Sequence, residues 1–156
     1  MPTKTTTYTT VAGLNKALRS LPKEASTQLR NASLGISRRI AAEAAGRARS
    51  QGGIAALVAP SIKAKYDRVP AIKMGSTAKL PTAGNDWERG RGGSRQTIGD
   101  VIWGAEFGGR GRPTTQQFLP HKGTAGYFLW PTVRDRSDEM QERYSEALDD
   151  ALQSIR

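Results

Sequence analysis

His121 is the only histidine in the chain and the residue best suited to acid–base chemistry. Lys122 follows it in a short turn, and an acid such as Glu106 would complete a proton-transferring pair. The alternative is a histidine exposed on a surface turn, which we favour because no third residue orients the imidazole. The chain also has no cysteine, which excludes disulfides, thiolate metal sites and cysteine nucleophiles. We therefore expect no enzymatic activity, no metal and no cofactor.

Two glycine-rich segments carry arginines that suit contact with nucleic acid. The arginines are Arg89, Arg91, Arg95, Arg110 and Arg112, and Trp87 lies near the first three. Arginine beside aromatic residues is typical of surfaces that bind phosphate backbones or single strands. Such runs are also common in solvated loops, and no helix-turn-helix, zinc or RNA-recognition motif accompanies them. They favour non-specific, salt-sensitive contact with DNA over sequence-specific binding.

The composition predicts a thin hydrophobic core. Leu, Ile, Val and Phe together number 27 of 156 residues, whereas alanine alone accounts for 20. That share of large apolar residues is below the roughly 20 % at which a highly charged chain begins to lose order. We therefore expect part of the order to come from packing against copies of the chain or against other proteins.

Charge is distributed unevenly along the chain. The net charge is +10, but residues 132–156 carry −3 and residues 1–131 carry +13. A basic body favours polyanionic partners, and an acidic end allows copies to pair head to tail. No segment is apolar enough to cross a membrane or to act as a signal peptide, so we expect a soluble, non-exported protein without a membrane partner.

Hydrophobic periodicity predicts helices at both ends of the chain. The first covers residues 11–21, and a long second helix runs from Pro22 to Gly52-Gly53. Its predicted buried stripe is Ala25, Leu29, Ala32, Ile36, Ile40 and Ala44. A last helix follows Pro131, with the stripe Val133, Met140, Tyr144, Ala147, Leu148, Ala151 and Ile155.

The middle of the chain predicts strands and loops. Residues 58–66 and 69–76 form a predicted hairpin that turns at 67–68 and exposes Lys63, Lys65 and Lys73. Further strands are predicted at 100–107 and 127–130, with glycines 104–111 leading from the first strand into a loop. Mobile loops are expected at 77–97 and 108–126, and an extended arm at 1–10. The fold class is α+β: residues 11–156 form one domain, with a small antiparallel sheet packed by a long N-terminal helix and a C-terminal amphipathic helix.

The order of these pieces resembles a known family. The long helix ASLGISRRIAAEAAGRAR is followed by a lysine-bearing hairpin, then GAEFGG, then QFLPHKGTAGYFLWPTVRD and an acidic helix. This order resembles the neck and tail-component proteins of long, non-contractile-tailed bacteriophages, over about residues 11–155 and most specifically at 105–108 and 127–131. Where many members carry Pro-Val-Asp-Thr-Gly this chain has residues 50–53, SQGG, and residues 77–97 look like an insertion.

The resemblance implies a non-enzymatic virion protein at the head–tail junction, acting as a connector, tail-completion or terminator subunit assembled in the host cytoplasm. It implies a ring of copies, for which tail symmetry favours six, with connector, stopper and tail-tube proteins as neighbours. The alternative is a basic DNA-binding accessory protein, and a third interpretation is a small hydrolase that uses His121.

Aromatic residues near the matching motifs are the expected contact residues. Large aromatic side chains dominate interface energetics, and an intrachain core is an equally good interpretation. Together with the glutamate of the GAEF motif, they are Glu106, Phe107, Phe118, Tyr127, Phe128 and Trp130. A further hypothesis places the arginine-rich loops toward the ring lumen or an adjoining ring, in contact with DNA or an acidic tail protein.

Overall fold

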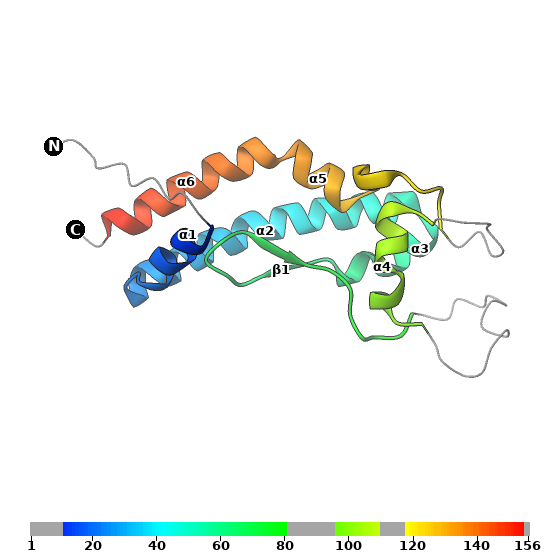
Figure 1. Ribbon diagram of the computed structural model, residues 1–156, viewed down its shortest axis with the longest axis horizontal. Helices are drawn as coiled ribbons and strands as arrows, with labels where there is room; N and C mark the ends of the chain where they lie inside the picture. The colour runs from blue at the N-terminus through cyan, green and yellow to red at the C-terminus, as the bar shows by residue number, and fades with distance from the viewer. Residues whose placement is uncertain (1–10, 81–95, 110–117, 155–156) are drawn as a thin grey trace.

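The computed structural model describes residues 11–80, 96–109 and 118–154. It is elongated, and one long helix runs through most of its length (Figure 1). The elements in chain order are α1 (Val11–Arg19), α2 (Lys23–Gln51), α3 (Gly53–Val58), η1 (Ala59–Ser61), β1 (Lys63–Lys65), β2 (Ala71–Lys73), α4 (Ile98–Phe107), η3 (Gly123–Ala125), α5 (Leu129–Asp135) and α6 (Ser137–Gln153). Helices predominate and one small antiparallel sheet is present, which confirms the predicted α+β class.

The long helix α2 organises the other elements. It begins directly after Pro22 and ends at Gly52, whose φ of +76° is readily adopted only by glycine. The acidic helix α6 lies along α2 and returns toward α1, while α3 and α4 gather at the opposite end (Figure 1). The predicted helices at both ends of the chain are therefore confirmed, although the last one is divided into α5 and α6 at Arg136.

The buried face of α2 differs from its predicted apolar stripe. Ala25, Leu29, Ile40 and Ala44 are buried as expected, but Ala32 and Ile36 are only half-buried. In their place the helix buries three serines, Ser26, Ser33 and Ser37. Serines are not expected on a buried stripe, because polar side chains are rarely buried without hydrogen-bond partners.

The serines bind the β-hairpin to α2. Ser33 Oγ donates to the carbonyl of Arg68 at 3.0 Å, and Ser37 Oγ accepts from the amide of Ala71 at 2.8 Å. Ser26 Oγ accepts from the Arg68 guanidinium at 3.0 Å. Backbone groups beside a short two-stranded sheet need partners when they are buried, and here α2 supplies them.

The hairpin itself is shorter than predicted. β1 and β2 pair antiparallel over three residues each, in the register Lys63↔Lys73, Ala64↔Ile72 and Lys65↔Ala71. The first part of the predicted strand is instead helical, in α3 and η1. The predicted exposure of Lys63, Lys65 and Lys73 is confirmed.

The predicted strand at residues 100–107 is wrong, because α4 occupies this segment. A capping box begins the helix: Asp100 Oδ2 accepts from the Thr97 amide at 2.7 Å, and Thr97 Oγ1 accepts from the Asp100 amide at 3.3 Å. This backbone hydrogen bond from Thr97 is the main reason why the pKa of Asp100 lies below its ordinary value. The buried residues of α4 are Ile98, Val101, Ile102, Ala105 and Glu106. Their spacing of three and four is helical, and it outweighs the β-branched alternation.

The predicted strand at residues 127–130 is also wrong. Phe128 is the residue before α5, and Leu129 and Trp130 form its first turn with Pro131. Proline is favoured in a first helical turn because its missing N–H has no intrahelical acceptor there. The short aromatic run therefore enters a helix instead of adding a strand to the sheet.

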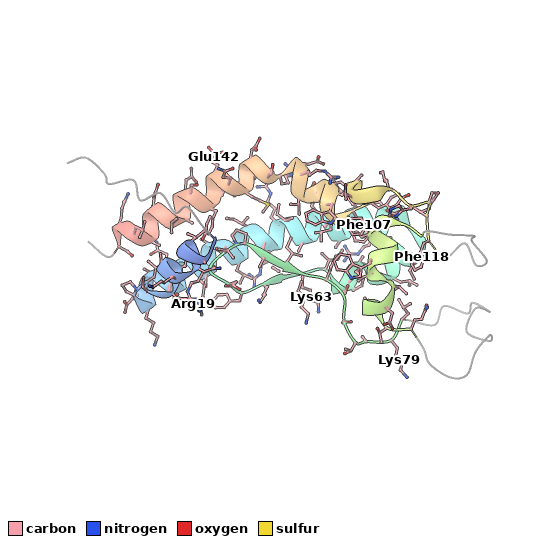
Figure 2. All side chains as sticks on the ribbon, viewed as in Figure 1. Arg19, Lys63, Lys79, Phe107, Phe118 and Glu142 are labelled. Atoms are coloured by element: carbon pink, nitrogen blue, oxygen red, sulfur yellow. The ribbon has the colours of Figure 1, made fainter. Side chains whose placement is uncertain are left out.

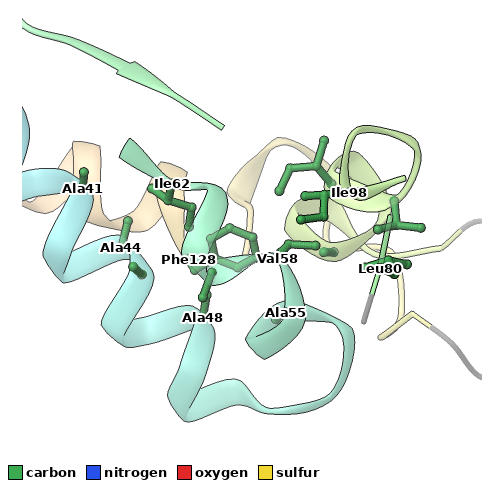
Figure 3. Packing of buried hydrophobic residues seen from close by; sticks show 14 residues of the cluster. Ala41, Ala44, Ala48, Ala55, Val58, Ile62, Leu80, Ile98 and Phe128 are labelled. Carbon is green, nitrogen blue, oxygen red and sulfur yellow. The ribbon is translucent and has the colours of Figure 1, made fainter. Parts of the chain in front are cut away.

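Two separate apolar clusters stabilise the two ends of α2. The larger one surrounds Phe128, which is fully buried against alanines of α2 and against Val58 and Ile62 (Figure 3). The smaller one joins α1, α2 and α6 through Leu18, Leu29 and Ala151. Many of the buried apolar residues are alanines, each of which removes little apolar area from water. The thin core predicted from composition is therefore present at both ends of the helix.

The predicted loops are only partly described. The described residues do not include 81–95 and 110–117, which contain the arginine-rich segments and part of the predicted loops. The predicted arm at 1–10 also lies outside the described residues. The described flanks at 79 and 97 meet in an isolated antiparallel bridge. No helix in the described ranges combines the length and apolar character needed to cross a bilayer.

Candidate interaction site around Glu106

Glu106 lies at the centre of the junction between α4 and α5. Its side chain is fully buried, and both carboxylate oxygens accept hydrogen bonds from the backbone that begins α5. Oε2 accepts from the amides of Phe128 at 3.3 Å and Leu129 at 2.9 Å. Oε1 accepts from the amide of Trp130 at 2.9 Å. Free amides at a helix N-terminus favour an anion, so α4 supplies the charge that caps α5.

Small residues allow this buried carboxylate to reach the backbone. Gly126 packs directly against it, and a Cβ atom on Gly126 would lie only 3.2 Å from the carboxyl carbon of Glu106. Its φ of +70° also requires glycine. Thr132, which is buried one turn into α5, donates from its hydroxyl to the Phe128 carbonyl at 2.7 Å. The result is a closely packed junction in which both carboxylate oxygens of Glu106 and the hydroxyl of Thr132 have hydrogen-bond partners.

Residues 118–122 form a strap that closes over α4. The ring of Phe118 lies against Gly104, where an added Cβ would be 2.6 Å from the ring. The amide of Gly109 donates to the carbonyl of Leu119, and the amide of Lys122 donates to the carbonyl of Phe107, both at 2.9 Å. The glycines at 104 and 108–109 therefore allow the strap to approach α4 closely. The prediction that these glycines lead from a strand into a loop is wrong, because the preceding segment is the helix α4.

An aromatic surface lies beside this junction. Trp103 and Phe107 stack with ring centroids 5.9 Å apart, and Trp103 is 60 % exposed. Leu119 of the strap is 45 % exposed, and Figure 2 shows Phe107 and Phe118 at this same end of the molecule. Tryptophan is enriched at interface hot spots, and Trp103 is both exposed and stacked, so this surface is the candidate interaction site.

A second apolar feature is a cavity of about 240 Å³ between α2, the hairpin, α5 and α6. Its lining residues include Ile40, Ile72, Trp130 and Met140. Trp130 is 44 % exposed and forms part of the rim. This tryptophan therefore connects the Glu106 junction, through its backbone, to the surface, through its side chain.

Ion pairs fix the α5–α6 corner to α2. Glu43 accepts from Arg136 at 2.9 Å and from Arg47 at 3.1 Å, and Arg47 also reaches Asp135 at 2.6 Å. The hydrogen bond from Arg136 is the main reason why the pKa of Glu43 is held below its ordinary value. Hydrogen bonding to Asp135 correspondingly raises the pKa of Arg47. These contacts hold α5 in the position from which it receives Glu106.

The structure separates the predicted anchor residues into two groups. Glu106 and Phe128 are fully buried and belong to the intrachain core. Trp130 is exposed, whereas the remaining three are half-buried: Phe107, Phe118 and Tyr127. The Tyr127 hydroxyl donates to the Pro120 carbonyl at 2.6 Å, and Lys122 lies 4.8 Å from the Tyr127 ring centre. The residue that sequence reasoning missed is Trp103, which a helical instead of a strand period would have placed opposite the buried face of α4.

The acid–base candidates are not arranged as a proton-transferring pair. His121 is exposed in the strap, whereas both oxygens of Glu106 accept backbone amides inside the junction. In the described ranges, no group of three or more acidic or histidine side chains is placed to hold a metal ion. The predicted DNA-contact arginines, Arg89, Arg91, Arg95, Arg110 and Arg112, lie outside the described residues.

The fold and site define a helix-rich α+β protein that presents an aromatic surface at one end. Comparison with known proteins found no matching family model, no matching curated protein and no matching solved structure.

Proposed function

We propose that the chain is a structural subunit of the junction between the head and tail of a tailed bacteriophage. It acts there by contact with neighbouring proteins, as a ring of copies, with six favoured by tail symmetry. The order of sequence motifs suggests this role, and the aromatic surface supplies a physical basis for it.

The observation that carries the proposal is the exposure of Trp103. Its ring is 60 % exposed although it stacks on Phe107, and it projects from a helix fixed by a capping box and by the Glu106 junction. A rigid aromatic group on a rigid element loses little conformational entropy when a partner covers it. Meanwhile the buried acid of the site is committed to backbone amides, which supports a structural role over a catalytic one.

The test is to locate the protein in virus particles. Particles with a C-terminally labelled chain should carry the label where head meets tail in negative-stain images. A label elsewhere on the particle, or none, would refute the proposal.

A pair of variants tests the aromatic surface separately. Trp103→Ala should leave the thermal unfolding midpoint of the purified protein within a few degrees of wild type and reduce incorporation into particles. Tyr66→Ala removes another exposed aromatic, 49 % exposed on the hairpin side, and should incorporate normally. Equal incorporation of both variants would exclude the Trp103 surface as a contact.

A further inference from the structure

A basic groove runs between α2 and β1, on the side of α2 away from α6. It has a volume of about 400 Å³ and a floor of small and apolar residues, including Ala42, Ala45 and Ile62. Its cationic rim consists of Arg38, Arg49 and Lys63, all exposed. Within the described ranges, none of these three cations forms an ion pair, although Arg39 and Arg47 on the neighbouring side of α2 do. The groove therefore presents uncompensated positive charge.

The hairpin concentrates further positive charge next to this groove. Lys63 lies directly opposite Lys73 in the strand register. Lys65 shares their exposed face, where it pairs with Asp67 at 3.4 Å. Like charges at opposed positions destabilise an antiparallel pair. An anionic partner would relieve this repulsion.

An acidic stripe lies on α6, facing away from α2. Its members are Asp138, Glu142, Glu146 and Asp149, which share one side of the helix by their spacing of three, four and eleven residues. All four are exposed, and none forms an ion pair with another described residue. The neighbouring Glu139 does pair, with Arg39 and Arg143, because it lies nearer to α2. The stripe therefore presents uncompensated negative charge.

The two charged surfaces match each other but cannot meet within one chain. Figure 2 shows Glu142 on one long edge of the molecule and Lys63 on the opposite edge. Arg38 and Arg49 are eleven residues apart on α2, as are Asp138 and Asp149 on α6, and eleven helical residues span about 16 Å. Equal spacing on two straight helices permits several charges to pair together.

We infer that the basic groove of one copy receives the acidic stripe of α6 from a second copy. The alanine floor lets the backbone of the incoming helix approach closely, while the cationic rim pairs with its carboxylates. Because the two surfaces differ and lie on opposite edges, the contact is heterologous, and repetition of it generates a ring or a filament. The inference rests on the proposed function for its biological setting, and it names the contact that would join copies in the ring.

Duplex DNA is the competing occupant of the basic groove. It would neutralise the same cations, but it would leave the acidic stripe without a partner and would even be repelled by it. The molecule carries a basic surface and an acidic surface on opposite edges, with charges at the same spacing. This arrangement favours a second copy of the chain as the occupant of the groove.

The experiment exchanges the charges of the two surfaces in the full chain. One variant carries Arg38→Glu and Lys63→Glu, a second carries Glu142→Lys and Asp149→Lys, and a third carries all four changes. Self-association is measured by sedimentation velocity at low salt, where the Debye length is about 30 Å instead of about 8 Å at physiological salt. Wild type should associate, and each two-site variant should dissociate with a dissociation constant raised about tenfold or more.

Restoration of association decides the inference. A mixture of the two two-site variants, and the four-site variant alone, should associate as wild type does, because complementary surfaces are re-created. Circular dichroism spectra that match wild type show that every variant is folded. Failure of both restorations, or wild type that stays monomeric at low salt, would overturn the inference.

DNA binding gives a distinct result. If duplex DNA binds wild type and the Glu142→Lys, Asp149→Lys variant but not the Arg38→Glu, Lys63→Glu variant, and neither restoration occurs, the groove binds DNA instead. Location of the label at the head–tail junction, tested separately, would leave the proposed function standing in either case.

Discussion

Replacement of Glu106 is the most direct test of the junction between α4 and α5. Glu106→Ala removes the acceptor for the amides of Phe128, Leu129 and Trp130, at 3.3, 2.9 and 2.9 Å. It also leaves a gap beside Phe128, which lies in the larger apolar cluster. The first turn of α5 then loses its cap, and α5 loses these hydrogen bonds to α4.

The structure allows the size of this effect to be worked out. Hydrogen bonds to a charged acceptor contribute about 1.5–3 kcal/mol each, so three of them contribute about 4.5–9 kcal/mol. We expect a loss near the lower limit, about 4.5 kcal/mol, because the amide of Trp130 is only partly buried and its side chain is 44 % exposed. Each amide that is left buried without an acceptor costs about 1–3 kcal/mol, and the cost of three such amides includes this value. Small domains have a total stability of about 5–15 kcal/mol, so Glu106→Ala should leave the protein close to unfolding.

Glu106→Gln separates the loss of hydrogen bonds from the loss of volume. The glutamine carbonyl can keep the two bonds that Oε2 accepts, while its NH₂ group faces the amide of Trp130, which then has no acceptor. We expect a loss of about 1.5–3 kcal/mol.

Urea unfolding followed by circular dichroism measures the free energy of unfolding of both variants, with Asp150→Asn, an exposed position of α6 outside the acidic stripe, as the control. The control should lie within about 0.5 kcal/mol of wild type. If Glu106→Gln were as stable as this control, the carboxylate would not be the cap of α5 and the reasoning would be wrong.

Two further predictions use the same measurement. Gly108→Ala should lower the free energy of unfolding by about 2 kcal/mol or more, because φ is +82° and the new methyl group would overlap the Pro120 carbonyl. Gly35→Ala, on an open face of α2, should raise the free energy of unfolding by about 0.5–1 kcal/mol. A change of the same sign in both variants would refute the close approach of the strap. Because the pKa of Glu43 is lowered chiefly by its hydrogen bond from Arg136, its contribution to stability should be complete above its ordinary pKa of 4.5 and be lost as pH falls through the lower folded-state pKa. Glu43→Gln should flatten this acid limb of the stability profile, and an unchanged slope would contradict the pairing.

The candidate site was predicted only in part from the sequence. The motif around Glu106 and the aromatic residues near it were recognised as anchors, but a strand period was assigned to residues that form α4. The apolar residues of this short segment fit both the period of a strand and that of a helix. The capping box at Thr97 and Asp100 was the local signal for a helix, and the exposure of Trp103 followed from it. Which residues face the core and which face solvent depended on that choice of period.

The sequence by itself determined the helices at the two ends, the position of the hairpin turn and the division of charge between a basic body and an acidic α6. These features depend on local spacing, on glycine and proline, and on composition, all of which act between near neighbours. Tertiary structure alone decided that Ser26, Ser33 and Ser37 are buried and that Glu106 caps a helix more than twenty residues away. A buried polar side chain is stable only beside its partner, and its partners here come from distant segments that no local pattern contains.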